Sequence, residues 1–196
     1  MYAREIGGKE YTFGVSGLLY RSNVLMYDHQ TESLWLQVKR RAVTGPLTGT
    51  PLPTLPSTVT TWSKWRKKHP DTRVLSLETG HRRDYDSDPY ESYYRSRKGL
   101  FSRFFTPGPG EVEKELVAGL EAEGTAKAYP LSLIQKEGVI RDRLGGEDVV
   151  LSYEQETDRI VARTAAGRDL QPIVAYWFVW KGIHPRTLRY AGEAGK

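Results

Sequence analysis

The chain has 196 residues, no cysteine and a formal net charge of +5 at pH 7. Its 38% hydrophobic and 27% charged residues are typical of a globular protein and exclude a disordered chain. Without cysteine there can be no disulfide, thiolate metal ligand or cysteine nucleophile, and the longest apolar run, Ile173 to Trp180, is too short to span a bilayer.

The first part of the chain predicts short antiparallel strands. Residues 3–10 have the pattern of a hairpin with a glycine turn, and residues 10–17 alternate as a half-buried strand. Strands over 24–27 and 33–38 flank the turn 28–32, in which we expect Glu32 to take the left-handed conformation. Residues 149–153 and 159–163 repeat this pattern around the turn 154–158.

The middle of the chain is irregular, with one helix. Residues 42–56 carry four prolines and predict a stiff loop. Thr60 or Thr61 should cap a helix that ends at His69 before Pro70, and a strand is expected over 73–77. The stretch 78–110 is too long for a passive connection between two elements.

The last part predicts a hairpin over 116–129, a short helix over 130–136 and a turn at Gly145-Gly146. No strand-helix-strand periodicity occurs, which argues against a Rossmann-type fold. The sequence therefore predicts an α+β fold of mostly antiparallel β hairpins with a few short helices.

Residues 62–72 and 177–187 both fit Trp-x-x-Trp-(Arg/Lys)-x-x-His-Pro-x-Thr, which predicts an internal duplication. We expect one compact domain made of two units, 1–110 and 111–196. The first unit starts in the middle of its pattern, so a strand near 3–6 or 10–15 should have an unpaired edge through which copies could form a homo-oligomer. The four motif tryptophans should be buried on their helices: Trp62, Trp65, Trp177 and Trp180.

The two histidines of this repeated motif could bind a metal ion. His69 and His184 could each supply one ligand to a metal, but a histidine before a proline also caps a helix end. We favour the structural role and predict no metal site, because no carboxylate lies at ligand spacing from either histidine.

The loop after the first motif is the strongest candidate for a ligand site. It combines cations, a carboxylate, an imidazole and phenols, which could hold a small molecule or an anion. The alternative is a tyrosine-rich loop fixed to the domain by salt bridges. The candidate ligand-binding residues are His81, Arg83, Asp84, Tyr85 and Tyr90.

Basic residues cluster at 64–68 and again at 95–103. A nucleic-acid surface would present such clusters together with exposed aromatic residues. We favour a solvated helix face and a basic loop, because charge patterning alone is weak evidence for nucleic-acid binding.

An ordered set of motifs covers nearly the whole chain. It comprises Thr12-Phe13-Gly14-Val15-Ser16-Gly17, Met26-Tyr27-Asp28-x-x-Thr31-x-Ser33-Leu34-Trp35, Thr61-Trp62-x-x-Trp65-x-x-x-His69-Pro70-Asp71-Thr72, Thr79-Gly80-x-x-Arg83-Asp84-Tyr85, Ala128-Tyr129-Pro130-Leu131 and Phe178-x-Trp180-x-x-x-His184-Pro185. By these motifs the chain resembles a prokaryotic family catalogued as domain of unknown function 3179.

The resemblance implies no defined activity. Members of that family carry a Cys-Pro-x-Cys pair upstream of the Thr-Phe-Gly-Val-Ser-Gly strand, and many look exported, whereas this chain has neither the pair nor a signal peptide. It also departs from the family at Glu32, His81, Asp158 and the pair Asp142-Arg143.

We therefore expect a binding module for a small molecule or anion. The alternative is a metal-handling or redox enzyme domain whose catalytic cysteines lie in an upstream segment. Neither a reaction nor a cofactor nor a compartment follows from the residues.

Overall fold

The structure is a computed structural model that describes residues 1–95 and 114–192. In its first part, β1 (Glu5–Ile6) and β2 (Lys9–Glu10) form the expected hairpin. An antiparallel sheet of order β3-β4-β5-β6 follows in chain order, with the short helix η1 between β5 and β6. Its elements are β3 (Phe13–Tyr20), β4 (Asn23–Asp28), β5 (Leu34–Leu36), η1 (Gln37–Lys39) and β6 (Arg41–Thr44).

A buried carboxylate organises the turn between β4 and β5. Asp28 accepts hydrogen bonds from the indole of Trp35 at 2.9 Å and from the backbone N–H of Thr31 at 2.6 Å. Burial by itself would raise the pKa of Asp28, but these hydrogen bonds hold that pKa below its usual value. Glu32 has φ +56°, as predicted, and Asp158 has the same φ in the corresponding turn of the second part.

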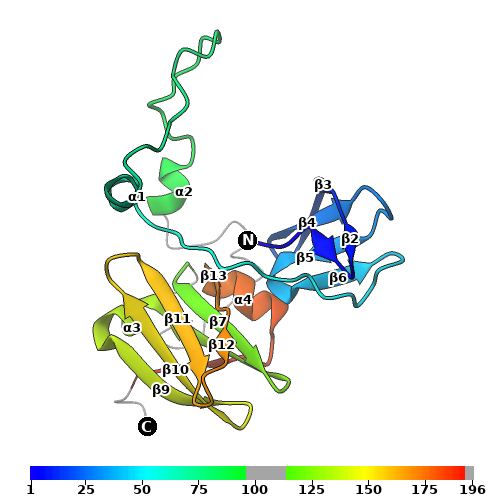
Figure 1. Ribbon diagram of the computed structural model, residues 1–196, viewed down its shortest axis with the longest axis vertical. Helices are drawn as coiled ribbons and strands as arrows, with labels where there is room; N and C mark the ends of the chain where they lie inside the picture. Colours follow the sequence, from blue (N-terminus) through cyan, green and yellow to red (C-terminus); the bar gives the residue numbers. More distant parts are fainter. Residues whose placement is uncertain (96–113, 193–196) are drawn as a thin grey trace.

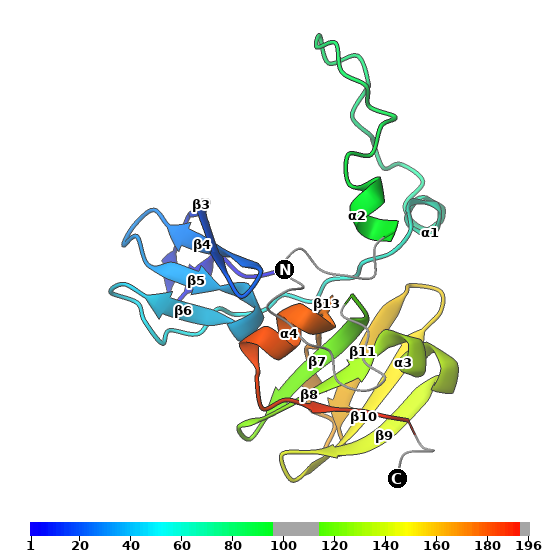
Figure 2. The same cartoon turned by 180° about the vertical axis from the view of Figure 1, so that it is seen from behind.

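The second part contains two further sheets and two short helices (Figures 1 and 2). One sheet has the order β12-β11-β10-β9 and the other β13-β7-β8-β14, with β14 parallel to β8 and the remaining pairs antiparallel. The elements are β7 (Leu116–Ala122), β8 (Thr125–Pro130), α3 (Leu131–Glu137), β9 (Val139–Leu144), β10 (Glu147–Glu154), β11 (Arg159–Thr164), β12 (Asp169–Leu170), β13 (Ile173–Tyr176), α4 (Trp177–Ile183) and β14 (Leu188–Arg189). The predicted α+β class, rich in antiparallel strands, is confirmed.

Helix α4 lies between the two parts of the molecule (Figures 1 and 2). On one side Trp180 contacts β7 at Gly119, where an added Cβ would come within 2.3 Å of the indole ring. The same hydrophobic cluster includes Leu36 and Val38 of the first part. The two parts therefore share a core through this helix.

The first tryptophan helix, α1 (Trp62–Lys68), is capped by Thr61 as expected, but its burial was predicted wrongly. Trp177 and Trp180 are each 1% exposed, whereas Trp62 is 49% and Trp65 is 42% exposed. The reason is that α1 has no sheet against it: its one described tether to the second part runs through Thr60 and Lys64 to the turn between β10 and β11.

The segment after α1 forms an arm that projects from the body (Figure 1). The strand predicted over 73–77 is absent, and Leu75 is 94% exposed, because no neighbouring strand pairs with this segment among the described residues. The stretch is irregular up to the helix α2 (Glu91–Arg95), as expected, and residues 96–113 lie outside the described part.

An exposed edge occurs near the predicted place. β3 is the outer strand of its sheet, and its Val15 and Leu19 are 74% and 59% exposed. Association of copies through this edge stays a prediction. So do the internal duplication and the division into units at residue 110, which falls outside the described residues.

The two inner tryptophans provide a matched test of this packing. Replacing Trp180 by Ala should cost about 3–5 kcal/mol of unfolding free energy, because it empties a fully buried site against Gly119. Replacing the half-exposed Trp65 should cost less than about 1.5 kcal/mol. Urea unfolding of both variants measures the difference, and equal losses would contradict the packing described above.

His184 follows α4 and is 5% exposed. Burial lowers its pKa to about 4, and repulsion from Lys39 and Arg40 adds to this effect. Lys39 Nζ lies 3.5 Å from His184 Nδ1, so the neutral imidazole accepts there, while the half-exposed Glu121 also lies 3.5 Å from Nδ1. The folded state therefore keeps His184 uncharged.

This burial predicts a pH dependence of stability. The pKa of His184 in the folded state, about 4, lies below the ordinary 6.5. The free energy of unfolding therefore has its full value with respect to this group above pH 6.5, and it decreases as the pH falls towards 4, because the unfolded chain then binds a proton that the folded state does not. The full loss is on the order of 3 kcal/mol. Urea midpoints measured between pH 7 and pH 4 should fall less steeply for His184→Gln, whereas His69→Gln, at the exposed equivalent, should match the unmodified chain. A His184→Gln profile as steep as that of the unmodified chain would refute the assignment.

Candidate functional site

The five residues predicted to bind a ligand all lie on the arm and are exposed: His81, Arg83, Asp84, Tyr85 and Tyr90. Their hydrogen bonds with other described residues are local. The hydroxyl of Tyr85 lies 2.5 Å from that of Thr79, and a carboxylate oxygen of Asp84 accepts from the backbone N–H of Asp86 at 3.1 Å. None of the five lines either of the two cavities described below, so their role in binding stays a prediction.

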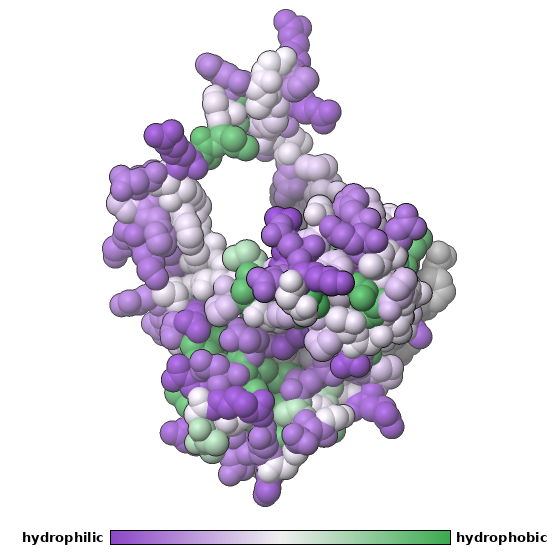
Figure 3. Space-filling model, turned by 45° about the vertical axis from the view of Figure 1, so that its right-hand side comes forward, coloured by the Kyte–Doolittle hydropathy of each residue, from purple (hydrophilic) through white to green (hydrophobic). Residues whose placement is uncertain are grey.

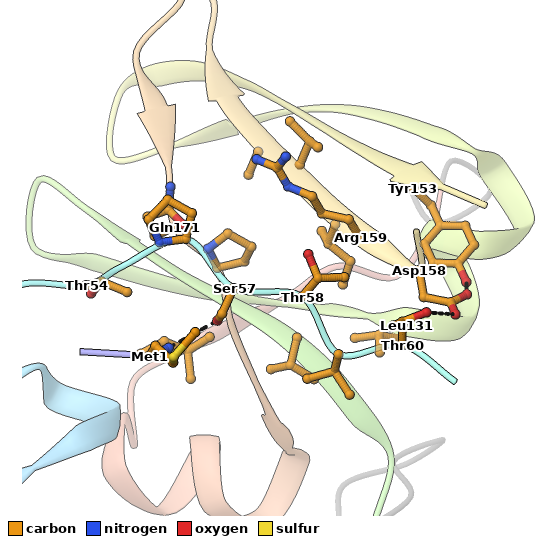
Figure 4. A pocket seen from close by; sticks show the side chains of 18 of the residues that line it. Met1, Thr54, Ser57, Thr58, Thr60, Leu131, Tyr153, Asp158, Arg159 and Gln171 are labelled. Atoms are coloured by element: carbon orange, nitrogen blue, oxygen red, sulfur yellow. Dashed lines mark hydrogen bonds between the residues drawn. The ribbon is translucent and has the colours of Figure 1, made fainter. Parts of the chain in front are cut away.

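The larger cavity, about 610 Å³, lies beneath the extended segment 54–61, which we call the strap (Figure 4). The strap leads from the first sheet to α1 and crosses the second part between β11 and β13. A smaller hollow of about 490 Å³ lies beside the β1–β2 hairpin. The volume under the strap is within the range of small-molecule sites.

One end of the cavity is closed by a hydrogen-bonded cluster around Asp158 (Figure 4). Its carboxylate accepts from Lys64 Nζ and from the Tyr153 hydroxyl at 2.6 Å each, and from the Thr60 hydroxyl at 3.1 Å. The hydrogen bonds from Lys64 and then Tyr153 lower the pKa of Asp158 to about 2, and the bond to Asp158 raises the pKa of Tyr153. This charge is satisfied and fixes the end of the strap.

The adjoining residue, Arg159, is a cation without such a partner. Its guanidinium is exposed and makes no ion pair or hydrogen bond with another residue in the part of the chain that the structure describes. Figure 4 shows its side chain running from beside Thr58 along β11, towards the side where Gln171 lies. An arginine in this position can donate a forked pair of hydrogen bonds to a carboxylate or phosphate.

The remaining lining of the cavity is mixed. Hydroxyl groups come from the strap, and apolar side chains come from α3, β11 and β13. The apolar members include Leu131, Ile160 and Val174. A ligand with an anionic head and an apolar body matches this distribution of groups.

This cavity could not be predicted from the sequence. The prolines in 42–56 correctly indicated a stiff loop, but nothing showed that its continuation crosses β11 and β13. Arg159 reads as an ordinary charged residue at the start of a strand. Arg159 becomes a candidate binding residue only because two segments about 100 residues apart in sequence, the strap and β11, lie side by side.

Three other kinds of feature could indicate a function: metal-binding clusters, basic surfaces and apolar helices. No group of three or more histidine, cysteine, aspartate or glutamate residues that could hold a metal ion occurs within residues 1–95 and 114–192. Most of the second basic cluster lies in 96–113, outside the described residues, so its position relative to α1 is not established. No helix within the described residues is long and apolar enough to cross a membrane.

Comparison with protein families supports the resemblance noted from the motifs. The model of one family, described as a protein of unknown function (DUF3179), matches residues 1–174. Comparisons with curated proteins and with solved structures found no match. Since the match covers most of the chain, the protein belongs to the DUF3179 family.

Proposed function

We propose that the protein is a binding module that holds a small anionic molecule in the cavity under the strap. The proposal rests on the position of Arg159. This arginine lines a cavity of about 610 Å³ and makes no ion pair with another described residue. The neighbouring carboxylate, Asp158, is already neutralised by Lys64, so it does not cancel the positive charge offered to a ligand.

The shape of the cavity indicates the class of ligand. A carboxylate or phosphate group would lie against Arg159 and accept from the strap hydroxyls of Thr58 and Ser57. The rest of the molecule would contact Ile160 and Val174. Because a cleft of this size buries most of a small ligand, we expect a compact organic anion and not an extended polymer.

The way in which the strap is fixed at both ends favours ligand binding in the cavity beneath it. The strap is fixed at one end by Thr60 and Lys64 on Asp158, and near its other end by backbone hydrogen bonds between residues 1–3 and 53–55. A strap held at both ends keeps the hydroxyls over the cavity before the ligand arrives, which reduces the ordering cost of binding.

A screen of compact anions tests the proposal. Inorganic phosphate, sugar phosphates, and mono- and dicarboxylates would be titrated by thermal shift, and hits confirmed by calorimetry. At least one should bind, and Arg159→Gln should weaken it by about tenfold or more, as expected when a charge-assisted hydrogen bond is lost.

Two matched variants locate the site. Arg141→Gln removes an exposed arginine of β9 outside the cavity and should leave affinity unchanged. Arg83→Gln removes the arginine of the arm site predicted from the sequence. Loss of binding in Arg83→Gln with retention in Arg159→Gln would move the site to the arm, and failure of the whole panel to bind would contradict an anion-binding function.

A further inference from the structure

The two tryptophan helices have the same local geometry, although only one is covered. In each, the inner indole donates to a threonine hydroxyl seven residues later, at 2.9 Å for Trp65 and 2.8 Å for Trp180. In each, the histidine backbone N–H donates to the inner tryptophan carbonyl at 2.8 Å, and the histidine ring lies 4.1 Å from the indole, centroid to centroid. The motif therefore folds the same way in both places.

In the second part, the hairpin β7–β8 covers this element. Trp180 lies on Gly119, which has no side chain to hold the indole away. The chain after His184 then continues beside the hairpin as β14, with Leu188 opposite Lys127 in parallel register (Figure 2). A helix and the strand that follows it thus dock together on one two-stranded hairpin.

The corresponding surface of the first copy is open. It consists of the apolar face of α1, with Trp62 at 49% and Trp65 at 42% exposure, and the segment 72–77, in which Val74 and Leu75 are 69% and 94% exposed. Hydrophobic surface on the arm is visible in Figure 3. No described strand pairs with residues 72–77. The N–H of Thr72 donates to the carbonyl of His69 and the carbonyl of Leu77 accepts from Thr79, whereas the backbone groups of residues 73–76 make no backbone hydrogen bond with another described residue and could pair with a strand.

The charge of this surface restricts what can cover it. Arg66, Lys67, Lys68 and Arg73 make no ion pair with another described residue. In the covered copy, acids from the β7 side face the motif. Glu121 lies 3.5 Å from His184, and Glu115, just before β7, pairs with Arg189 at 2.6 Å.

We propose that α1 together with residues 72–77 is a docking surface for an acidic β-hairpin of a partner polypeptide. The hairpin presents a glycine to Trp65, and one of its strands pairs with residues 72–77 as β8 pairs with β14. Its acidic side chains face the basic residues of α1. This surface is separate from the cavity under the strap, and binding to one does not require binding to the other.

The hairpin of the chain itself supplies the probe. A backbone-cyclised peptide of residues 116–130, which carries Gly119 and Glu121, would be titrated into the intact protein while tryptophan fluorescence is recorded. Binding should shift the emission to shorter wavelength, because Trp62 and Trp65 become covered, with a dissociation constant below about 1 mM.

Three variants separate specific docking from adhesion to an apolar surface. The peptide with Gly119→Ile should bind at least about tenfold more weakly, since its side chain collides with the indole. In the protein, Trp65→Ala should have the same effect, and Arg66→Glu with Lys67→Glu should weaken binding in a salt-dependent manner. A control variant must leave the fold intact, which excludes a change at the buried Trp35. Arg141 is exposed on β9, so Arg141→Gln serves as the variant that should bind the peptide as the unmodified protein does.

Each other result overturns the proposal. Absence of binding by the unmodified peptide refutes hairpin docking, and equal binding by the Gly119→Ile peptide shows adhesion without docking. A concentration-dependent dimer in sedimentation that is lost in Trp65→Ala would show that a second copy covers the surface. Tight binding of an oligonucleotide that requires Arg66 and Lys67 would assign the surface to nucleic acid.

Discussion

The close contact between Trp180 and Gly119 is the constraint on which the arrangement of the molecule depends. It brings α4 down onto β7, and the hydrophobic cluster formed there also includes Leu36 and Val38 from the first part. A side chain at position 119 would lift the helix and open the core that the two parts share. The path of the strap follows from this packing, because the strap connects the first sheet to α1 across the docked second part.

Buried polar groups reinforce this arrangement in specific places. Asp28 holds the β4–β5 turn through Trp35 and Thr31, and Arg40 donates to the carbonyl oxygen of Gln171 across the junction of the two parts. By contrast, α1 and the arm are joined to the body through few contacts, of which the Lys64–Asp158 ion pair is the principal one described. Elements with few buried contacts open at low free energy, so α1 is the part of the described chain best placed to respond to a partner.

Local features of this fold could be predicted from the sequence, and features that need a partner could not. The left-handed Glu32 and a threonine cap at position 60 or 61 depend on residues within four positions, and the structure has both, with Thr61 as the cap. Burial of Trp62 and Trp65 and a strand at 73–77 were predicted wrongly, because the motif is identical whether or not a hairpin covers it. The cavity around Arg159 could not be predicted because it joins the strap to β11 and β13, which are distant in sequence. The residue types of the arm and its position in a loop carry no information about concavity.

The same local tryptophan–histidine–threonine geometry is found at two places in the molecule, covered at Trp180 and open at Trp65. Hydrogen exchange of the indole Nε1–H groups, followed by NMR, compares the two places, because both groups donate to a threonine hydroxyl at nearly the same distance. Only burial then distinguishes them. We expect the indole N–H of Trp180 to exchange at least about a thousandfold more slowly than that of Trp65. Comparable protection of the two indoles would show that the α1 surface is already covered and that Trp65 is not open to a partner.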